Sequence, residues 1–594
     1  MNLISEINTI KDNYENGTIE LVEGLEFSQK NTIKRIEYIL NSKYESGDFD
    51  SRGKKKPFFN TSKFRLNIAI RATDFDTKDI QVVGEDTAEN YVRAMILREE
   101  LRDWMDEVNF AKTLNEMGTT RASHGGVIVK RIIKDGQLHI EVPVWKNTVT
   151  DPVDIASGTK MEKHYMNMVD IQAKKGVWKF LEDEWDEVVK VFKKVNGKNF
   201  TTADKVCVLE IEGAFPNSYL EYEGETDFDE EYSLQRHIVL CGADEQPVCC
   251  LHSEEKKESD YKYLSWFKVA GRALGVGVIE DGFESQLSMN DIAIRQKQIL
   301  EYVSKIVYKT DDTTLANNNL LDADNGFIVQ LAEGRDISLL NSTPNSFPIL
   351  TELVQQWDSQ YERVSSTFGA VSGESMPSGT PFRAVAIQNQ EASSLFQYRK
   401  EEFGIFVEEI MNDWVLPHLA KKINKEHILR SENFSPEELS AIDEAFKTYR
   451  ANEEAINSAL QGKVMTWEEY QDLKQNLGKV IASTNKSRFL EVPKDYFKDF
   501  KGKVKVITTG EQVNKAVVFE SISNIIALVG QNPAILKDPV LSKLFGKIVE
   551  MAGIGISPAE IANMANNMSQ PALQAPEQMQ EVAQSLAPQE QAVV

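Results

Sequence analysis

Two long helical patterns separated by a turn-rich insert constrain the fold of this chain most. In each pattern, apolar residues recur every three or four positions and therefore share one helical face. They are Ile279, Phe283, Leu287 and Ile294 within residues 278–306, and Ile349, Leu353, Trp357, Tyr361 and Val364 within residues 346–371. A helix of about 26 residues is about 39 Å long, which suits a rod packed against copies of itself. An ordinary helical hairpin in a monomeric core fits the same periodicity.

The polar faces of both helical segments are acidic on balance. Their carboxylates are Glu280, Asp281, Glu284, Asp291, Glu301, Glu352, Asp358 and Glu362. The basic residues on the same faces are fewer: Arg295, Lys297, Lys305 and Arg363.

The insert, residues 307–345, differs in character from the helices around it. Residues 309–314 and 317–319 are rich in Asp, Asn and Thr, which favour turns. Residues 326–331 predict a short strand. A small β-rich knob between two long helices belongs at one end of a rod. The loop that follows the second helix, residues 372–383, combines glycines and prolines, which predict mobility bounded by stiff points.

The overall charge restricts the classes of partner. The chain has 594 residues, which predicts about three or four domains, and its net charge is −25. Proteins that grip nucleic acid by neutralising phosphates show basic patches, so this charge argues against that class. It is compatible with a protein past which nucleic acid slides. The N-terminus lacks the apolar stretch of a signal peptide, and no apolar run is long enough to span a membrane.

The remaining segments predict an α+β first half and a helical second half. Asp135-Gly136 lies between β-branched runs and predicts a hairpin. Residues 381–422 predict a long helix with bend points at Gly404 and Pro417. Residues 431–565 predict a helical domain, and the Gln-rich residues 567–594 a low-complexity tail.

The densest basic run, residues 52–57, is interpreted as a solvated loop in preference to a phosphate contact.

Enzyme and metal-site motifs are missing from the sequence. It contains no P-loop and no His-Glu-x-x-His, and Gly275-Val276-Gly277 is only half of a dinucleotide-binding fingerprint. Its cysteines match no zinc signature and are expected to be buried thiols: Cys207, Cys241, Cys249 and Cys250. We therefore expect no catalytic residue, no metal and no cofactor, but a structural protein with long helices.

Four stretches, taken in order, carry a family resemblance. They are residues 145–155 with 162–170, residues 266–290, the helix–knob–helix–loop order itself, and residues 506–515. With them, the chain resembles the portal proteins of tailed double-stranded-DNA bacteriophages, and most resembles those of the crAss-like group. The resemblance covers most of residues 55–560. No single stretch is as specific as a P-loop, and the order of the stretches carries the resemblance.

The resemblance implies a portal fold of the α+β class, assembled as a ring of twelve subunits at one capsid vertex of the virion, after synthesis in the host cytoplasm. The first part would comprise a wing (residues 1–270), two stem helices (271–306 and 346–371) and, between them, a clip (307–345). After the second stem helix would come a tunnel loop (372–383), a long wing helix (384–430), a crown (431–566) and a Gln-rich tail or barrel (567–594).

The implied function is that of a conduit for genome packaging and ejection, not of an enzyme. The implied partners are further copies of the chain, double-stranded DNA passing through without sequence specificity, the major capsid protein, the terminase and the neck or adaptor proteins, with no membrane. Acidic stem helices would repel DNA phosphates and so favour sliding. Another virion or scaffold protein without a DNA channel is the alternative, and a nucleic-acid enzyme with a diverged acidic site is a third class.

The implied site residues fall into three groups. The tunnel-loop residues are Gly373, Glu374, Ser375, Met376, Pro377, Ser378, Gly379 and Thr380. The acidic candidates for channel lining are Glu280, Glu284, Asp291, Glu301, Glu352, Asp358 and Glu362. The clip candidates for docking are Asp311, Asp312, Asn317, Asn318 and Asn319.

Overall fold

The computed structural model combines helices and sheets, with 53% helix and 21% strand among the residues it describes, which confirms the α+β class. It describes residues 2–84, 88–221, 231–303, 308–311, 333–339, 346–367, 382–423, 428–430, 436–484, 489–493, 496–497, 500 and 502–506. These residues belong to one compact unit, residues 1–507. No helix in the described part of the chain has the length and apolar composition needed to cross a membrane.

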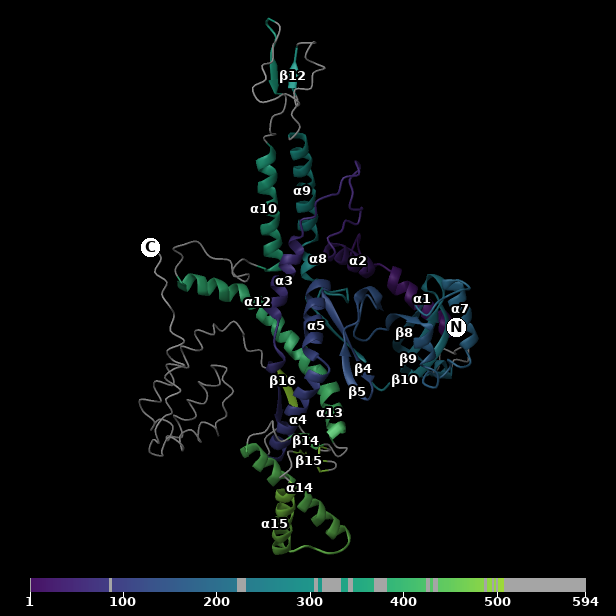
Figure 1. Cartoon of the computed structure of the whole chain (residues 1–594), viewed down its shortest axis with the longest axis vertical. Helices are drawn as coiled ribbons and strands as arrows, with labels where there is room; N and C mark the ends of the chain where they lie inside the picture. Colours follow the sequence, from purple (N-terminus) through teal and green to yellow (C-terminus); the bar gives the residue numbers. More distant parts are fainter. Residues whose placement is uncertain are drawn as a thin grey trace. The chain divides into compact units, whose positions relative to one another are not determined.

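An antiparallel five-stranded sheet has the strand order β10-β9-β8-β7-β6 (Figure 1). The strands are β6 (Thr148–Thr150), β7 (Lys160–Asn167), β8 (Lys205–Pro216), β9 (Tyr232–Cys241) and β10 (Pro247–Glu255). Alternate residues of β8 point to opposite faces. Leu209 packs in a cluster with Leu3 and Ile7 of α1 (Leu3–Asn16), and Val208 in one with α6 (Met168–Gln172) and α7 (Trp185–Asn196).

A three-stranded antiparallel sheet, of order β11-β4-β5, contains the hairpin predicted at Asp135-Gly136. Its strands are β4 (Gly126–Lys134), β5 (Gln137–Glu141) and β11 (Tyr261–Ser265). Asp135 and Gly136 have φ angles of 53° and 80°, the positive values that a two-residue hairpin turn requires. The predicted hairpin is therefore confirmed.

The largest core cluster joins helices from the first and second halves of the chain. It contains residues of α4 (Ala88–Glu107), α5 (Phe110–His124), α12 (Phe382–Ile410), α13 (Leu416–Ile423) and α14 (Pro436–Leu460). Strand β16 (Gly502–Val506) closes this core by pairing antiparallel with β3 (Ile80–Gly84). The free edge of β16 is also satisfied, because the Asn412 side chain accepts a hydrogen bond from Val504 N (2.7 Å) and donates one to Val504 O (3.2 Å).

The long helix predicted at residues 381–422 is present, but its irregularity lies at one place only. Helix α12 runs unbroken through Gly404 and continues into a π-helical turn, η6 (Met411–Val415), and α13. The turn directly precedes Pro417, which has no N–H and cannot complete the α-helical hydrogen-bond ladder. At Gly404 the helix is not interrupted, because a glycine removes no hydrogen bond from a helix.

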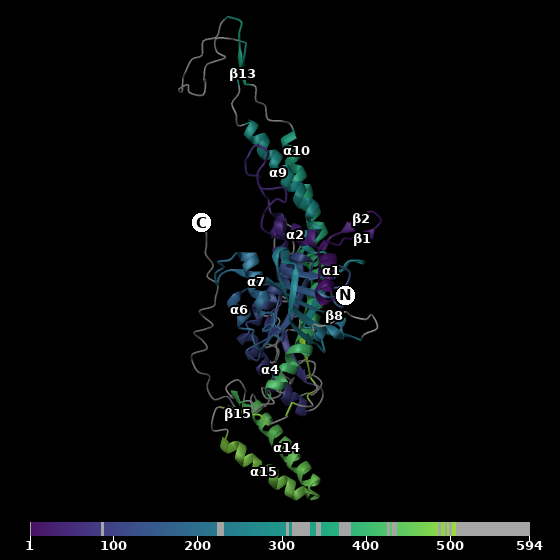
Figure 2. The ribbon, with the colours of Figure 1, turned by 90° about the vertical axis from the view of Figure 1, so that its right-hand side faces the viewer.

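The remaining elements complete the described structure. They are β1 (Ile19–Val22), β2 (Leu25–Phe27), α2 (Gln29–Leu40), α3 (Thr61–Thr73), η1 (Thr77–Asp79), η2 (Trp145–Asn147), η3 (Asn217–Glu221), η4 (Ala243–Glu245), α8 (Val278–Asp281), α9 (Phe283–Val303), β12 (Tyr308–Thr310), β13 (Ile337–Leu339), α10 (Ser346–Ser365), β14 (Ile428–Arg430), α15 (Trp467–Thr484) and β15 (Phe489–Glu491). Helices α9 and α10 pack side by side (Figures 1 and 2).

Candidate functional site

The paired helices α9 and α10 meet the rest of the chain at a glycine. Gly282 separates α8 from α9, so the helix predicted at residues 278–306 is interrupted there. A Cβ atom at this position would lie 1.9 Å from Cζ of Tyr361, which shows that the tyrosine ring rests on the glycine backbone. The Tyr361 hydroxyl donates a hydrogen bond to Val278 O at 3.0 Å. Burial raises the pKa of Tyr361 well above its usual value, so the hydroxyl remains a donor.

Two buried amide side chains fix α9 to the start of α3. Oε1 of Gln286 accepts hydrogen bonds from both the backbone N–H and the hydroxyl of Ser62, each at 2.9 Å. Oδ1 of Asn290 accepts one from the Phe59 N–H at 2.8 Å. Both amides are almost fully buried. Polar side chains at such positions set one orientation of a helix, because any shift would leave buried groups unpaired.

A single arginine ties the end of α10 to α3. The buried Arg65 guanidinium donates to Thr367 O at 2.8 Å and to Asp358 Oδ2 at 3.0 Å. Glu362 Oε1 lies 4.0 Å from the same guanidinium. Arg65 therefore both holds the chain just beyond the end of α10 and neutralises two carboxylates on that helix.

The apolar positions of the paired helices are only partly covered within the chain. Ile279 and Tyr361 are fully buried. In contrast, the exposed fractions are 51% for Leu287, 57% for Ile349 and 46% for Val364. The single apolar face predicted from Ile279 to Ile294 is thus divided, because the break at Gly282 places Ile279 in the core and leaves Leu287 outside. Several large apolar side chains of α9 and α10 are therefore exposed in the described structure: Leu287, Leu300, Ile349 and Val364.

Most carboxylates predicted to line a channel have basic partners in the same chain. The pairs are Glu280 with Arg272, Asp291 with Arg295, Glu301 with Lys54, and Asp358 and Glu362 with Arg65. Glu284 and Glu352 are exposed and have no basic partner within the described part of the chain. Sequence reasoning missed Lys54 and Arg65 because both come from the N-terminal region, and no local spacing signals the contact.

The predicted clip and tunnel loop are described only in part. Strands β12 and β13 pair antiparallel, and Arg335 donates to Asp311 O at 2.6 Å. Asp311 itself is exposed. Asp312, Asn317, Asn318, Asn319, the strand predicted at 326–331 and all predicted tunnel-loop residues from Gly373 to Thr380 lie outside the described residues.

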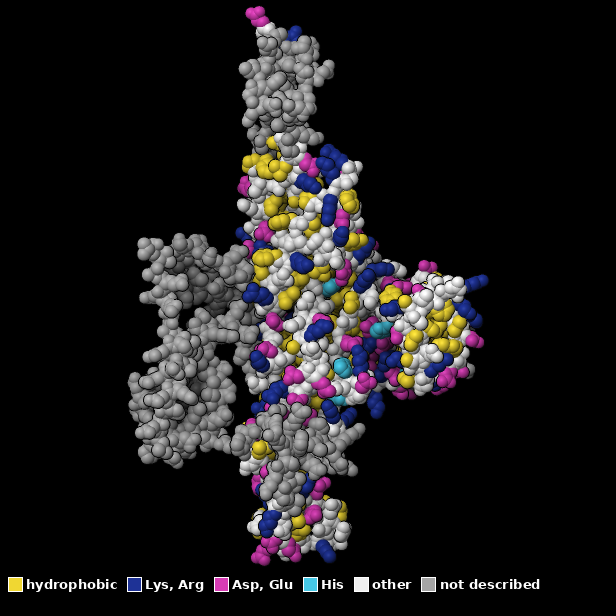
Figure 3. All heavy atoms as spheres, viewed as in Figure 1, with side chains coloured by type: hydrophobic (Ala, Val, Ile, Leu, Met, Phe, Trp, Pro, Cys, Tyr) yellow, Lys and Arg dark blue, Asp and Glu magenta, His cyan; other side chains and the backbone are white. Residues whose placement is uncertain are grey.

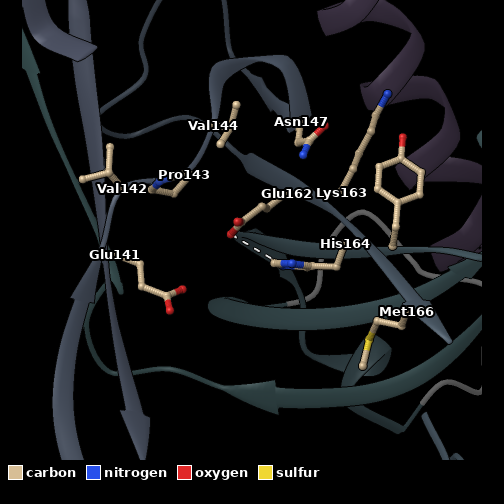
Figure 4. Close-up of a pocket in the computed structure, with 10 residues that line it drawn as sticks. Glu141, Val142, Pro143, Val144, Asn147, Glu162, Lys163, His164 and Met166 are labelled. Atoms are coloured by element: carbon tan, nitrogen blue, oxygen red, sulfur yellow. Dashed lines mark ion pairs between the residues drawn. The ribbon is translucent and has the colours of Figure 1, made fainter. Parts of the chain in front are cut away.

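A separate cluster of titratable groups lies where the two larger sheets meet. Ligand atoms of Glu162, His164 and Glu210 lie within 4.8 Å of one another, which is close enough to hold a metal ion. His164 points toward Glu162 at the wall of a pocket of about 500 Å³ (Figure 4). However, the buried Lys130 ammonium lies 2.9 Å from Glu162 Oε2 and 2.6 Å from Glu210 Oε2. A metal ion would have to displace this ammonium group.

The cluster instead joins the sheets electrostatically. Lys130 lies on β4, whereas both carboxylates lie on the five-stranded sheet, and Arg236 Nε adds a contact of 2.8 Å to Glu210 Oε1. Burial alone would raise the pKa of Glu210, but the hydrogen bond with His164 and the charges of Lys130 and Arg236 hold it well below its usual range. The buried charges are paired, as stable burial requires.

All four cysteines are free and buried, as predicted. Cys249 and Cys250 are adjacent on β10 and enter the clusters on opposite faces of the five-stranded sheet. Burial raises the pKa of the Cys249 thiol to about 12, so it stays protonated and unreactive at neutral pH.

The sequence matches no protein-family model, and no curated protein is significantly similar to it. Function is therefore inferred from the residues and the geometry above.

Proposed function

We propose that this protein is a portal subunit, which assembles with further copies into a ring that conducts double-stranded DNA. The observation that carries this proposal is that large apolar side chains remain exposed on α9 and α10, the pair of helices anchored to the core by Tyr361, Gln286, Asn290 and Arg65. Leu287, Leu300, Ile349 and Val364 are each 46–57% exposed. In this proposal, contacts between copies join these side chains into one apolar surface, since large apolar patches mark sites of protein association. The ring in this proposal requires a head-to-tail contact between copies whose rotation closes, since head-to-tail contacts that do not close give open filaments.

The electrostatics of the chain are compatible with DNA passing through such a ring. The net charge is −25, and Glu284 and Glu352 leave unneutralised negative charge on the exposed sides of the paired helices. Negative walls repel phosphates and disfavour sticking. In this proposal the ring lies at one capsid vertex, contacts the major capsid protein, and docks the terminase and later the neck proteins through residues 307–345.

Negative-stain electron microscopy of the purified protein tests this proposal. We expect closed rings with a central aperture. Leu287→Glu places a charge at an exposed apolar position of α9 and should abolish rings while leaving the subunit folded. The matched control is Val177→Glu, which changes a valine that is 67% exposed and lies outside α9 and α10. This variant should assemble normally.

Two results would overturn the proposal. If the protein stays monomeric at every salt and protein concentration tested, it does not form a ring. A closed assembly without an aperture wide enough for duplex DNA favours another virion or scaffold protein. Equal assembly of Leu287→Glu and the wild-type protein would show that Leu287 does not lie in a contact between copies, and the observation that carries the proposal would lose its force.

A further inference from the structure

A pocket rich in lysine lies beside helix α9. It has a volume of about 540 Å³ and is lined by Lys43, Lys55, Lys56 and Lys297, together with Tyr44 and Phe58. Asp48 is the one carboxylate among its lining residues, all of which the structure describes. In a chain with a net charge of −25, four lysines against one aspartate form an unusual local excess of positive charge. Lys and Arg side chains are visible along this side of α9 in Figure 3.

The loop that supplies three of these lysines is folded rather than freely solvated. Asp50 Oδ1 accepts hydrogen bonds from the N–H groups of Arg52 (2.9 Å) and Lys54 (2.8 Å). Lys54 forms an ion pair with Glu301 of α9 at 2.5 Å. The basic run, residues 52–57, is thus a mostly exposed loop, in agreement with its interpretation as a solvated loop, and it is also held in place against α9.

The lysine charges of the pocket are only weakly neutralised. Lys43 pairs with Asp48. Lys297 donates to the neutral carbonyl of Lys55 at 2.8 Å, and Lys56 donates to Gly47 O at 2.9 Å. Within the described structure, Lys55 has no carboxylate at ion-pair distance and is exposed. Three ammonium groups thus border one pocket without a carboxylate partner of their own, which favours an anionic ligand.

The two aromatic rings indicate what kind of anion fits. Tyr44 and Phe58 are half-buried, and their centroids are 5.0 Å apart in an edge-to-face contact. Lysines that follow a phosphate backbone, next to aromatic rings that contact bases or sugars, are typical of single-stranded nucleic-acid sites. Lysine also binds phosphate as a point charge. An acidic protein segment would use the lysines but not the rings.

We propose that this pocket binds a backbone phosphate of nucleic acid, with the adjoining sugar or base against Tyr44 and Phe58. This inference goes beyond the proposed function and does not depend on it, because nothing places the pocket in a channel. It requires contact with nucleic acid at a local site, whereas the acidic exterior elsewhere disfavours contact.

Fluorescence anisotropy with labelled single-stranded and duplex DNA tests the inference on the intact, assembled protein. The test variant is Lys55→Gln with Lys297→Gln. The control is Lys112→Gln with Lys190→Gln, at two exposed lysines (74% and 70%). Both double variants change the net charge by the same amount, from −25 to −27 because two lysines are lost. Comparison of the two therefore separates the pocket from a general charge effect.

We expect the test variant to bind DNA about tenfold more weakly at moderate salt, while the control changes less than about twofold. The slope of log affinity against log salt should become less negative by about 0.7 for single strands, because the pocket holds one phosphate and each phosphate contact contributes about 0.7. Lys55→Gln alone removes a charge without removing a described contact. It should show part of the loss even if the double variant disturbs the loop.

Three outcomes would overturn the inference. Equal DNA affinity in the test and control variants would show that the lysine pocket does not bind DNA. Competition by inorganic phosphate with no effect of the variants on DNA binding assigns the pocket to free phosphate. Loss of assembly with unchanged DNA binding assigns it to an acidic segment of another copy. Rings that form normally with unchanged DNA affinity refute this inference alone, whereas absence of rings refutes the proposed function alone.

Discussion

Replacing Gly282 by alanine tests the junction between the paired helices and the core. Gly282 has φ −98° and ψ 7°, which any residue can adopt, so alanine brings no backbone strain. The added methyl group, however, would lie 1.9 Å from Cζ and 2.1 Å from Cε2 of Tyr361. The ring is fully buried and cannot swing into solvent. The effect of the substitution is therefore steric, and its sign is destabilising.

The expected magnitude combines three contributions. Overpacking a buried site costs about 1–3 kcal/mol. Displacing the ring also breaks the hydrogen bond from Tyr361 to Val278 O and leaves a buried carbonyl unpaired, which costs about 1–3 kcal/mol. The smaller backbone entropy of the unfolded alanine variant offsets about 0.4–1 kcal/mol. The net loss is about 3 kcal/mol, or roughly 3 °C in melting temperature if residues 1–507 unfold together.

Thermal melting combined with hydrogen exchange of α8 and α9 measures this loss. Gly478→Ala on α15 is the control, because its added methyl group would meet only the flexible end of Lys447, at 3.2 Å, so we expect no loss. Tyr361→Leu should relieve the clash, so Gly282→Ala with Tyr361→Leu should be less destabilised than the sum of the single variants. Strict additivity, with a wild-type melting temperature for Gly282→Ala, would refute the contact.

Three further predictions concern other buried groups. Arg65→Ala should destabilise α10 by about 1–3 kcal/mol. This range is below the cost of breaking a fully buried ion pair, because Asp358 is 41% exposed and solvent screens the pair. Faster hydrogen exchange in α10 measures the loss. Asn412→Ala should cost about 2–4 kcal/mol, because both backbone groups of Val504 lose a partner, and exchange of the Val504 amide reports it. The depressed pKa of Glu210 stabilises the fold above the unfolded value of about 4.3, and this stability is lost as pH falls toward the folded value. Glu210→Gln should therefore flatten the decline of melting temperature below about pH 4.5, and an unchanged decline would contradict the assignment.

Local chemistry made some elements predictable from the sequence. The Asp135-Gly136 hairpin depends on two residues with positive φ between β-branched runs, and it forms as predicted. The irregular turn before Pro417 follows from a missing N–H. Cys249 and Cys250 lie on opposite faces of the five-stranded sheet because successive side chains of a strand point to opposite faces.

Contacts between distant segments were not predictable in the same way. The break at Gly282 depends on the ring of Tyr361, and the neutralisation of Asp358 depends on Arg65. Periodicity alone therefore gave a continuous helix and an unpaired acidic face. The pairing of Lys130 with Glu162 and Glu210 likewise joins residues from separate sheets, and nothing in their local sequence marks them as buried.

The pairing of β16 with β3 has a consequence for synthesis on the ribosome. Ile80 pairs with Val506, so the largest core cannot close until nearly all of residues 1–507 have been translated. Until then the nascent chain exposes one edge of β3 and the Asn412 amide, and unpaired strand edges of this kind recruit other chains. A premature stop before residue 502 should therefore yield aggregated polypeptide and not a shortened soluble subunit.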